Sequence, residues 1–339
     1  MTVSPESIPR CTAAEALAVA ERDYGIVGSA STLPSERDQN FLIVDSAGGK
    51  FVLKIANSAE GEDLLDFQNQ AMRCVAAASI GCRLPRVVTT RSGQDVSRIH
   101  NSRAGVEHCL RVLTWIDGEV LGKVGVRGPE LFESIGAGMA RIDAALSQFR
   151  HPAMRRVLQW DLRQAVLARE HLHLLSPDRQ RRVERAFARW ERIDWTALRH
   201  SVIHGDANDH NLIIESGRMV GILDFGDIVY SATVCDLAVA LAYVLLDERQ
   251  PLAAAARVIG AYQRTYPLNS AEQEVLMPLV ESRLAMSVCY SVHNRARHPD
   301  DPYQSVTEAA AWDLLDKFER WSADETRAMM NKACGALDV

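Results

Sequence analysis

The residues best suited to chemistry lie in one short stretch of this sequence. Asp206 is followed by an amide at Asn211, and a second carboxylate, Asp224, comes thirteen residues after that amide. Carboxylate and amide oxygens are hard ligands, which suit Mg²⁺ holding the phosphates of a nucleotide. Asp206 stands at the start of the loop, where it can accept a proton from an attacking hydroxyl. The stretch therefore predicts a site for phosphoryl transfer.

The segment between the amide and the second carboxylate has the pattern of a β-hairpin. Apolar residues 212–214 are followed by a turn at 215–218 and a second apolar run at 219–223. A hairpin returns the chain to its starting point. It would therefore carry Asp224 back toward Asn211.

The spacing resembles that of the protein-kinase-like phosphotransferases. In that family Asp-x-x-x-x-Asn supplies the base and a metal ligand, and Asp-Phe-Gly supplies the second ligand. The opening His204-Gly205-Asp206, in place of His-Arg-Asp, is similar to the aminoglycoside phosphotransferase and choline kinase branch. Residues 33–41 and 205–211 look most like its hydroxylysine kinase-like members, some of which are fused to class III aminotransferases. The resemblance covers roughly residues 10–320.

The resemblance implies an α+β, bilobal protein-kinase-like fold. A small antiparallel-sheet N-lobe would span residues 1–115, and a mainly helical C-lobe would span 116–339. Asp206 would be the catalytic base, and Asn211 and Asp224 would bind Mg²⁺. ATP or GTP would be the phosphoryl donor.

Other residues of the N-lobe are expected to contact the nucleotide. Lys54 lies in the middle of an apolar strand, where an unpaired ammonium is costly, so we expect it to pair with the phosphates. The alternative is an edge-strand lysine that reaches solvent. Ser35 and Asn40 are further candidates for phosphate contacts. Leu113 and Trp115 lie in a segment that resembles the hinge contacting adenine, although Trp115 could equally be core packing.

The acid that normally orients the lysine is not evident. The family pattern places Gln68 where a glutamate is expected on a helix over residues 60–80. Either Asp66 or Glu62 takes that role, or a neutral amide orients Lys54.

Residues near the loop suggest the kind of acceptor. Asp227 would help to bind Mg²⁺ or a substrate ammonium. Arg283 would pair with a substrate carboxylate, or form a structural ion pair. Asp236 is expected to hold the catalytic loop from behind, and His204 to brace it. The leading acceptor is a small amino alcohol or hydroxy amino acid of the hydroxylysine or ethanolamine type, and the alternative is an aminoglycoside.

Three other functions explain the sequence less completely. A metallohydrolase could use His204, Asp206 and His210, but that interpretation leaves Asn211 and Asp224 unexplained. A protein kinase usually has lysine where this chain has Asn208, and no Ala-Pro-Glu segment follows Asp-Phe-Gly. A catalytically silent nucleotide-binding module is supported only by the departure at the helix 60–80.

Composition narrows the class of protein further. The 339 residues are 47% hydrophobic and 24% charged, and a formal net charge of −6 argues against a general nucleic-acid binder. The seven cysteines are scattered without a Cys-x-x-Cys pair, and no signal peptide is evident, so we expect reduced thiols and a cytoplasmic location. The apolar run 237–246 is too short to span a bilayer, which favours a buried helix and no membrane partner.

Apolar periodicity and turn residues predict the remaining elements. Strands are expected over residues 27–33, 40–45, 50–55 and 85–90, with a hairpin near 91–108. Helices are expected over residues 12–23, 60–80, 129–148, 157–175, 177–193, 233–247, 251–265 and 270 to about 295. Capping-box patterns lie at Thr12/Glu15, Ser270/Gln273, Ser305/Glu308 and Ser322/Glu325.

Overall fold

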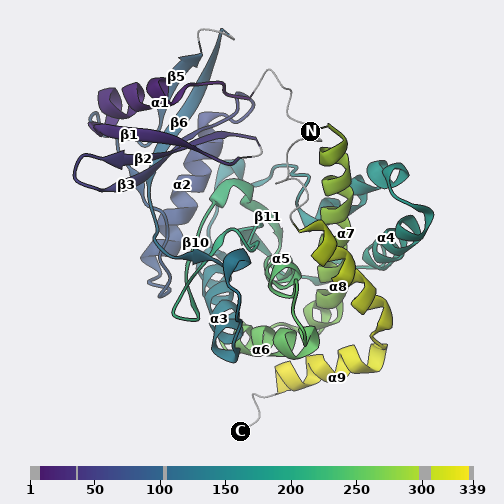
Figure 1. The fold of residues 1–339 in the computed structure, drawn as a ribbon. Coiled ribbons are helices and arrows are strands. Elements are labelled where there is room, and N and C mark those ends of the chain that lie inside the picture. Colours follow the sequence, from purple (N-terminus) through teal and green to yellow (C-terminus); the bar gives the residue numbers. More distant parts are fainter. Residues whose placement is uncertain (1–7, 36, 102–104, 298–306, 336–339) are drawn as a thin grey trace. The chain divides into compact units, whose positions relative to one another are not determined.

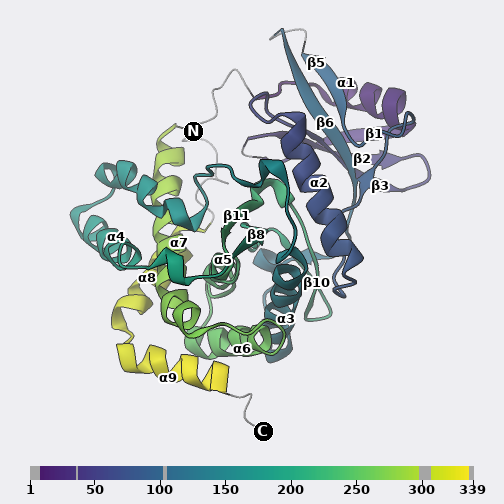
Figure 2. The same cartoon turned by 180° about the vertical axis from the view of Figure 1, so that it is seen from behind.

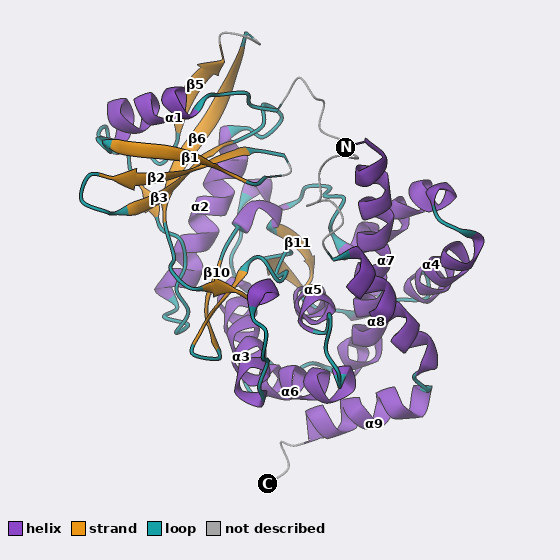
Figure 3. Ribbon diagram, viewed as in Figure 1, coloured by secondary structure: helices purple, strands orange, loops and turns teal. Residues whose placement is uncertain are grey.

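The computed structural model describes residues 8–35, 37–101, 105–297 and 307–335 (Figure 1). The chain forms two compact units. The first comprises the chain through Ala77 together with Arg83–Asp117 and His151–Ala153, and the second comprises the remainder. Figure 3 shows that the first unit holds the larger sheet and that the second is mainly helical, which confirms the expected α+β class.

The first unit is an antiparallel sheet with two helices. The strand order is β1-β2-β3-β6-β4, with β5 also paired to β6. Its elements are α1 (Ala13–Val19), β1 (Gly28–Leu33), β2 (Gln39–Asp45), β3 (Lys50–Ile55), α2 (Glu62–Ala77), β4 (Val87–Val88), β5 (Ser97–Asn101) and β6 (Val106–Thr114).

Helix α1 begins at the predicted capping box. The Thr12 hydroxyl accepts from the Glu15 backbone N–H, and the Glu15 carboxylate accepts from the Thr12 backbone N–H. The helix continues as a π-helical turn, Ala20–Tyr24, and ends at Gly25, whose φ of 73° is a left-handed conformation that favours glycine.

Lys54 extends from an interior strand of the sheet. Strand β3 lies between β2 and β6, so Lys54 pairs in register with Asn40 on one side and Arg111 on the other. The Lys54 side chain is buried, and the edge-strand alternative is therefore wrong. Because side chains alternate along a strand, Lys54 extends from the face opposite its neighbours Leu53 and Ile55, which belong to an apolar core with α1.

The second unit is built around buried helices and two small sheets. One sheet has the order β10-β9-β7, and the other is the pair β11-β8. The elements are β7 (Glu119–Val120), α3 (Pro129–Leu146), α4 (Pro177–Trp190), β8 (His200–Ile203), β9 (Leu212–Glu215), β10 (Arg218–Ile222), β11 (Val229–Ala232), α5 (Val234–Val244), α6 (Pro251–Gln263), α7 (Ser270–Arg297), α8 (Glu308–Arg320) and α9 (Ala323–Cys334).

Helix α5 lies at the centre of this unit, beside the pair β8 and β11 (Figure 2). All of its residues are buried, as the apolar run predicted. Among the described residues, α7 is the one helix long and apolar enough to cross a membrane by length and composition, but 83% of that window is buried inside the structure. Such burial is typical of a core helix.

The helix expected at 157–175 is wrong in start and type. The segment is a 3-10 helix over Leu162–Leu174, capped by the Asp161 side chain. Its start is delayed because tertiary contacts occupy the preceding carbonyls: Tyr290 donates to that of Gln159 and Arg283 to that of Trp160.

Two of the other predicted caps can be compared with the structure. Helix α7 is capped one residue earlier than expected, by reciprocal hydrogen bonds between Asn269 and Glu272. The box at Ser322/Glu325 is confirmed. Ser305 lies outside the described residues.

A close approach of α3 to α6 generates a stability prediction. A Cβ added at Gly136 would lie 2.0 Å from the carbonyl oxygen of Val258, so Gly136→Ala must push the two helices apart. Alanine would otherwise favour the helix by about 1 kcal/mol. We expect overpacking to dominate and to lower the free energy of unfolding by about 2 kcal/mol.

The measurement is urea unfolding followed by circular dichroism. Gly125→Ala is the control, because nothing lies within 4 Å of a Cβ at that position. Equal midpoints for the Gly136 variant and the parent would show that the helices do not constrain one another here.

Candidate active site

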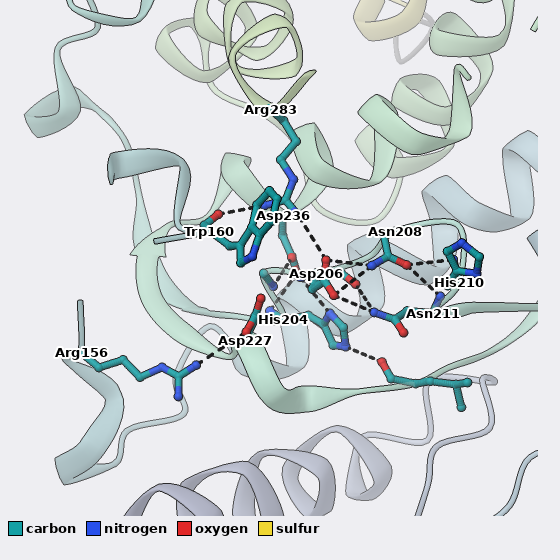
Figure 4. Close-up of polar contacts among 12 residues, drawn as sticks. Arg156, Trp160, His204, Asp206, Asn208, His210, Asn211, Asp227, Asp236 and Arg283 are labelled. Atoms are coloured by element: carbon teal, nitrogen blue, oxygen red, sulfur yellow. Dashed lines mark hydrogen bonds and ion pairs between the residues drawn. The ribbon is translucent and has the colours of Figure 1, made fainter. Parts of the chain in front are cut away.

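The path of the catalytic loop is set by one carboxylate behind it. Asp236, in the first turn of α5, accepts the backbone N–H of His204 at 3.1 Å and that of Gly205 at 2.7 Å (Figure 4). The loop begins directly after β8, so the strand end and these two bonds fix its direction. The expected role of Asp236 is confirmed.

A second carboxyl lies against the first. Asp143 of α3 contacts Asp236 and accepts the Tyr262 hydroxyl of α6 at 2.6 Å. Burial and the charge of Asp236 raise the pKa of Asp143 well above its usual value. The raised pKa favours the protonated form of Asp143, in which its hydroxyl could donate to Asp236 while that residue accepts from the loop. Sequence patterns did not indicate Asp143.

His204 ties the catalytic loop to the next hairpin. Its Nδ1 accepts the Asp206 backbone N–H at 3.3 Å, and its Nε2 donates to the carbonyl of Leu223 at 2.9 Å. The ring also meets Phe225 edge-on. The bracing role is confirmed, and both ring nitrogens are occupied by backbone groups. The ranges that the structure describes contain no group of three His, Cys, Asp or Glu side chains able to hold a metal ion, so the metallohydrolase hypothesis has no support.

Gly205 allows the loop to pass close to the turn that follows the hairpin. Its φ of 80° is left-handed, and a Cβ at this position would lie 2.6 Å from the carbonyl oxygen of Asp227. Glycine satisfies both the backbone conformation and the close approach.

Asp206 is held by three donors. The Asn208 amide lies 3.0 Å from each carboxylate oxygen, and the Asn211 amide donates to Oδ2 at 2.8 Å. Arg283 donates to Oδ1 at 3.1 Å. The side chain remains 20% exposed, so an acceptor hydroxyl can reach it. The role of Asn208 was not predicted, although its position two residues after the aspartate was noted.

The surroundings raise the proton affinity of Asp206. Burial and the nearby charge of Asp227 raise its pKa to about 7, while Arg283 opposes the rise. A carboxylate of this proton affinity is a better general base near neutral pH than an ordinary aspartate.

Asn211 and Asp224 are brought together by the hairpin. The Leu223 backbone N–H donates to the carbonyl of Asn211 at 2.8 Å, and Asp224 is the next residue along the chain. Asn211 uses its Nδ2 on Asp206, so its Oδ1 points elsewhere. Asp224 adopts a left-handed φ of 52°, and its Oδ1 accepts from Gly226. The amide oxygen of Asn211 and the carboxylate of Asp224 are hard ligands of the kind that suits a divalent cation such as Mg²⁺.

Asp227 is a third carboxylate of this region. It is buried, its charge acts on Asp206, and the Arg156 Nη2 lies 3.9 Å from its Oδ1. Arg156 also donates to the carbonyl of Gly226 at 2.6 Å. Sequence reasoning missed Arg156, which precedes the 3-10 helix and carries no motif.

Arg283 pairs with the candidate base. Besides its bond to Asp206, it donates to the Trp160 carbonyl at 2.9 Å, and its side chain is 2% exposed (Figure 4). Of the two expectations for Arg283, the structure supports the ion pair.

In the first unit, Gln68 meets an arginine. Arg111 donates to the side-chain oxygens of Gln68 and Asn69 on α2. Because Arg111 and Lys54 extend from the same face, α2 presents amides to that face where the family pattern led us to expect an acid. Asp66 accepts from Gln70 and lies beside His151, and Glu62 pairs with Arg98.

The other candidate nucleotide residues of this unit lie as follows. Ser35 is exposed before β2, and Asn40 lies on β2 with no hydrogen bond to its Oδ1 in the described part of the chain. Leu113 is buried on β6. Trp115 is half-buried and donates from Nε1 to Asp117, so it is not a core residue.

These features define a family. The phosphotransferase enzyme family (APH) matches residues 29–270, and the chain belongs to it. The fold, the Asp206–Asn211 loop and the Asp-Phe-Gly turn are thus those of a kinase that phosphorylates an alcohol group.

Relatives and solved structures agree with this assignment. The hydroxylysine kinase of Mus musculus is 30% identical over 340 residues, covering 91% of this chain and 90% of the relative. That of Danio rerio is 26% identical, covering 94% and 95%. The fold is similar to amicoumacin kinase hAmiN (TM-score 0.64, 17% identity, 85% and 88% covered) and to a microcompartment-associated aminopropanol kinase (TM-score 0.63, 14% identity, 94% and 93% covered). The chain is a small-molecule phosphotransferase.

The raised pKa of Asp143 generates a pH prediction. Asp143→Asn keeps a neutral side chain that can donate to Asp236 and accept from Tyr262. The folded parent retains the Asp143 proton at a pH where the unfolded chain has lost it, so the parent loses stability as pH rises above about 4. The variant lacks this dependence. We expect its stability relative to the parent to increase with pH.

Urea unfolding of both proteins between about pH 5 and about pH 8 measures this difference. A constant difference across that range would mean that Asp143 titrates normally in the folded state.

Proposed function

We propose that this protein is a Mg²⁺- and nucleotide-dependent kinase for the hydroxyl of a small hydroxy amino acid or amino alcohol, with 5-hydroxylysine as the leading acceptor. The observation that carries the proposal is the placement of Asp206 and Asn211 side by side, next to the strand end that leads to Asp224. Base and metal ligands need this proximity to act on one phosphoryl group.

Asp206 would orient the acceptor hydroxyl and take its proton. Its raised pKa supports this role, because the proton is then accepted near neutral pH. The amides of Asn208 and Asn211 would keep the carboxylate aimed at the hydroxyl. Much of the rate enhancement would come from positioning.

Asn211 and Asp224 would hold Mg²⁺, which neutralises charge on the transferring phosphates when bound. Lys54 would contact the phosphates of ATP or GTP, with Ser35 and Asn40 as further candidates. Leu113 and Trp115 would lie near the base of the nucleotide. A cytoplasmic location would fit these donors and the free cysteines.

The acceptor class rests on two supports. Relatives aligned over nine-tenths of the chain are hydroxylysine kinases. In addition, the carboxylates Asp206, Asp224 and Asp227 gather at the loop, where an amine-bearing acceptor would be attracted. Asp227 is our candidate for the ammonium.

The proposal is tested by coupled release of ADP or GDP in the presence of Mg²⁺. The acceptors are 5-hydroxylysine, ethanolamine, choline, homoserine, threonine and several aminoglycosides. Turnover concentrated on 5-hydroxylysine would support the proposal. Turnover confined to the aminoglycosides would replace it with an antibiotic phosphotransferase.

The candidate base is tested by Asp206→Asn. We expect kcat to fall by about 10²- to 10⁴-fold, because proton acceptance is lost, while nucleotide affinity stays near that of the parent. Asp316→Asn is the matched control, since Asp316 is also a partly buried, ion-paired aspartate but lies on α8. Full activity in the Asp206 variant would remove it from the base role.

The candidate metal ligand is tested by Asp224→Ala. Without this carboxylate we expect the Mg²⁺-dependent part of nucleotide affinity to fall at least about 10-fold, with metal-free affinity unchanged. Calorimetric titration with and without Mg²⁺ measures both. If Mg²⁺ strengthens binding equally in variant and parent, the metal ligand must lie elsewhere.

A further inference from the structure

Arg283 is an unusual residue for a helix core. It lies on α7 with 2% of its side chain exposed, and its guanidinium lies over the Trp160 ring at 4.6 Å and the Tyr243 ring at 5.5 Å. Burying a guanidinium costs several kcal/mol unless partners compensate for the lost water. The aromatic faces and hydrogen-bond acceptors supply that compensation.

Its hydrogen bonds join the catalytic loop to the segment before the 3-10 helix. Nη1 donates to the Trp160 carbonyl and Nη2 to the Asp206 carboxylate. Its Nε is buried without a hydrogen-bond partner among the described residues. A buried donor left unsatisfied is unfavourable, so this Nε reduces the net stabilisation that the other contacts of Arg283 provide.

Building on the proposed function, we propose that Arg283 is a positioning residue, which fixes the Asp206 carboxylate for phosphoryl transfer and does not bind the carboxylate of the acceptor. Asp206 Oδ2 accepts from the Asn208 and Asn211 amides, whereas Oδ1 accepts from Asn208 and Arg283. Arg283 is thus the charged member of the three donors that hold this carboxylate.

Burial argues against the competing role. An acceptor carboxylate could reach this guanidinium only by displacing Asp206 or the Trp160 carbonyl. Displacing Asp206 would separate the base from the donor that orients it. A residue that binds the acceptor carboxylate should have hydrogen-bond donors exposed to solvent. Only 2% of the Arg283 side chain is exposed.

The two roles differ in their kinetic effects. A positioning residue acts on every acceptor and lowers kcat, because a misplaced base loses rate by up to about 100-fold. Removing a residue that binds the acceptor carboxylate would raise the KM of acceptors that carry a carboxylate and leave the KM of other acceptors unchanged.

The test compares Arg283→Met and Arg283→Lys. The Lys variant keeps the positive charge without the planar fork, so we expect its loss of kcat to be smaller than that of the Met variant. Arg199→Met is the matched control. Arg199 also lies over an aromatic ring, Tyr266, and pairs with a buried carboxylate, Glu272, away from the catalytic loop.

Each protein is assayed with 5-hydroxylysine and with its carboxamide, which has the same shape without the negative charge. We expect kcat of the Arg283→Met protein to fall about 100-fold with both acceptors, and the ratio of their KM values to match that of the parent. The Arg199 control should keep the parental kcat. A raised KM for 5-hydroxylysine alone would overturn the proposal in favour of carboxylate binding, and an unchanged kcat would leave Arg283 with a structural role only.

A crystal structure of the Arg283→Met protein provides a readout that needs no acceptor. We expect the Asp206 carboxylate to rotate away from its hydrogen bonds to Asn208 and Asn211. An unmoved carboxylate would overturn the proposal even if the acceptor is not the one we infer. Absence of turnover in the parent with every acceptor, together with a displaced carboxylate in the variant, would instead reject the proposed function alone.

Discussion

The catalytic loop depends on Asp236 accepting two backbone N–H groups. Buried N–H groups must have partners, so the loop takes the path on which those two bonds form. Asp236 belongs to a fully buried helix, and Asp143 and Tyr262 connect it to α3 and α6. The position of Asp206 therefore depends on the packing of the helical core, and that core is close-packed and moves little at ordinary temperature.

The site combines residues of one short segment with residues from distant parts of the chain. Asp206, Asn211 and Asp224 come from one loop and hairpin, whose geometry follows from short-range hydrogen bonds such as that of Leu223 to Asn211. The residues that hold this segment come from elsewhere in the chain. Arg283 approaches from α7, and Arg156 from the irregular segment before the 3-10 helix. The candidate base and metal ligands thus come from one short segment, and their exact positions depend on tertiary contacts.

This division also describes what could be predicted. Alternating strands such as β3, capped helices such as α1, and the motif hairpin follow from local patterns, and the structure confirms them. Local patterns did not predict the start of the helix expected at 157–175. Side chains of α7 donate hydrogen bonds to the carbonyls of Gln159 and Trp160, and the local sequence does not reveal these tertiary contacts. Likewise, no local pattern reveals that Gln68 faces Arg111, since the pairing is a tertiary contact between α2 and β6.

Gly205 has a consequence for how catalytic loops diverge within this superfamily. A side chain at its position would collide with the carbonyl of Asp227 and would require a strained left-handed backbone. The arginine found in the His-Arg-Asp pattern of protein kinases could not be introduced here by a single substitution. The turn after the hairpin would have to withdraw at the same time. The residue between His204 and Asp206 is thus restricted by the distance between the catalytic loop and the turn after the hairpin. It can be replaced by a larger residue only when both segments change together.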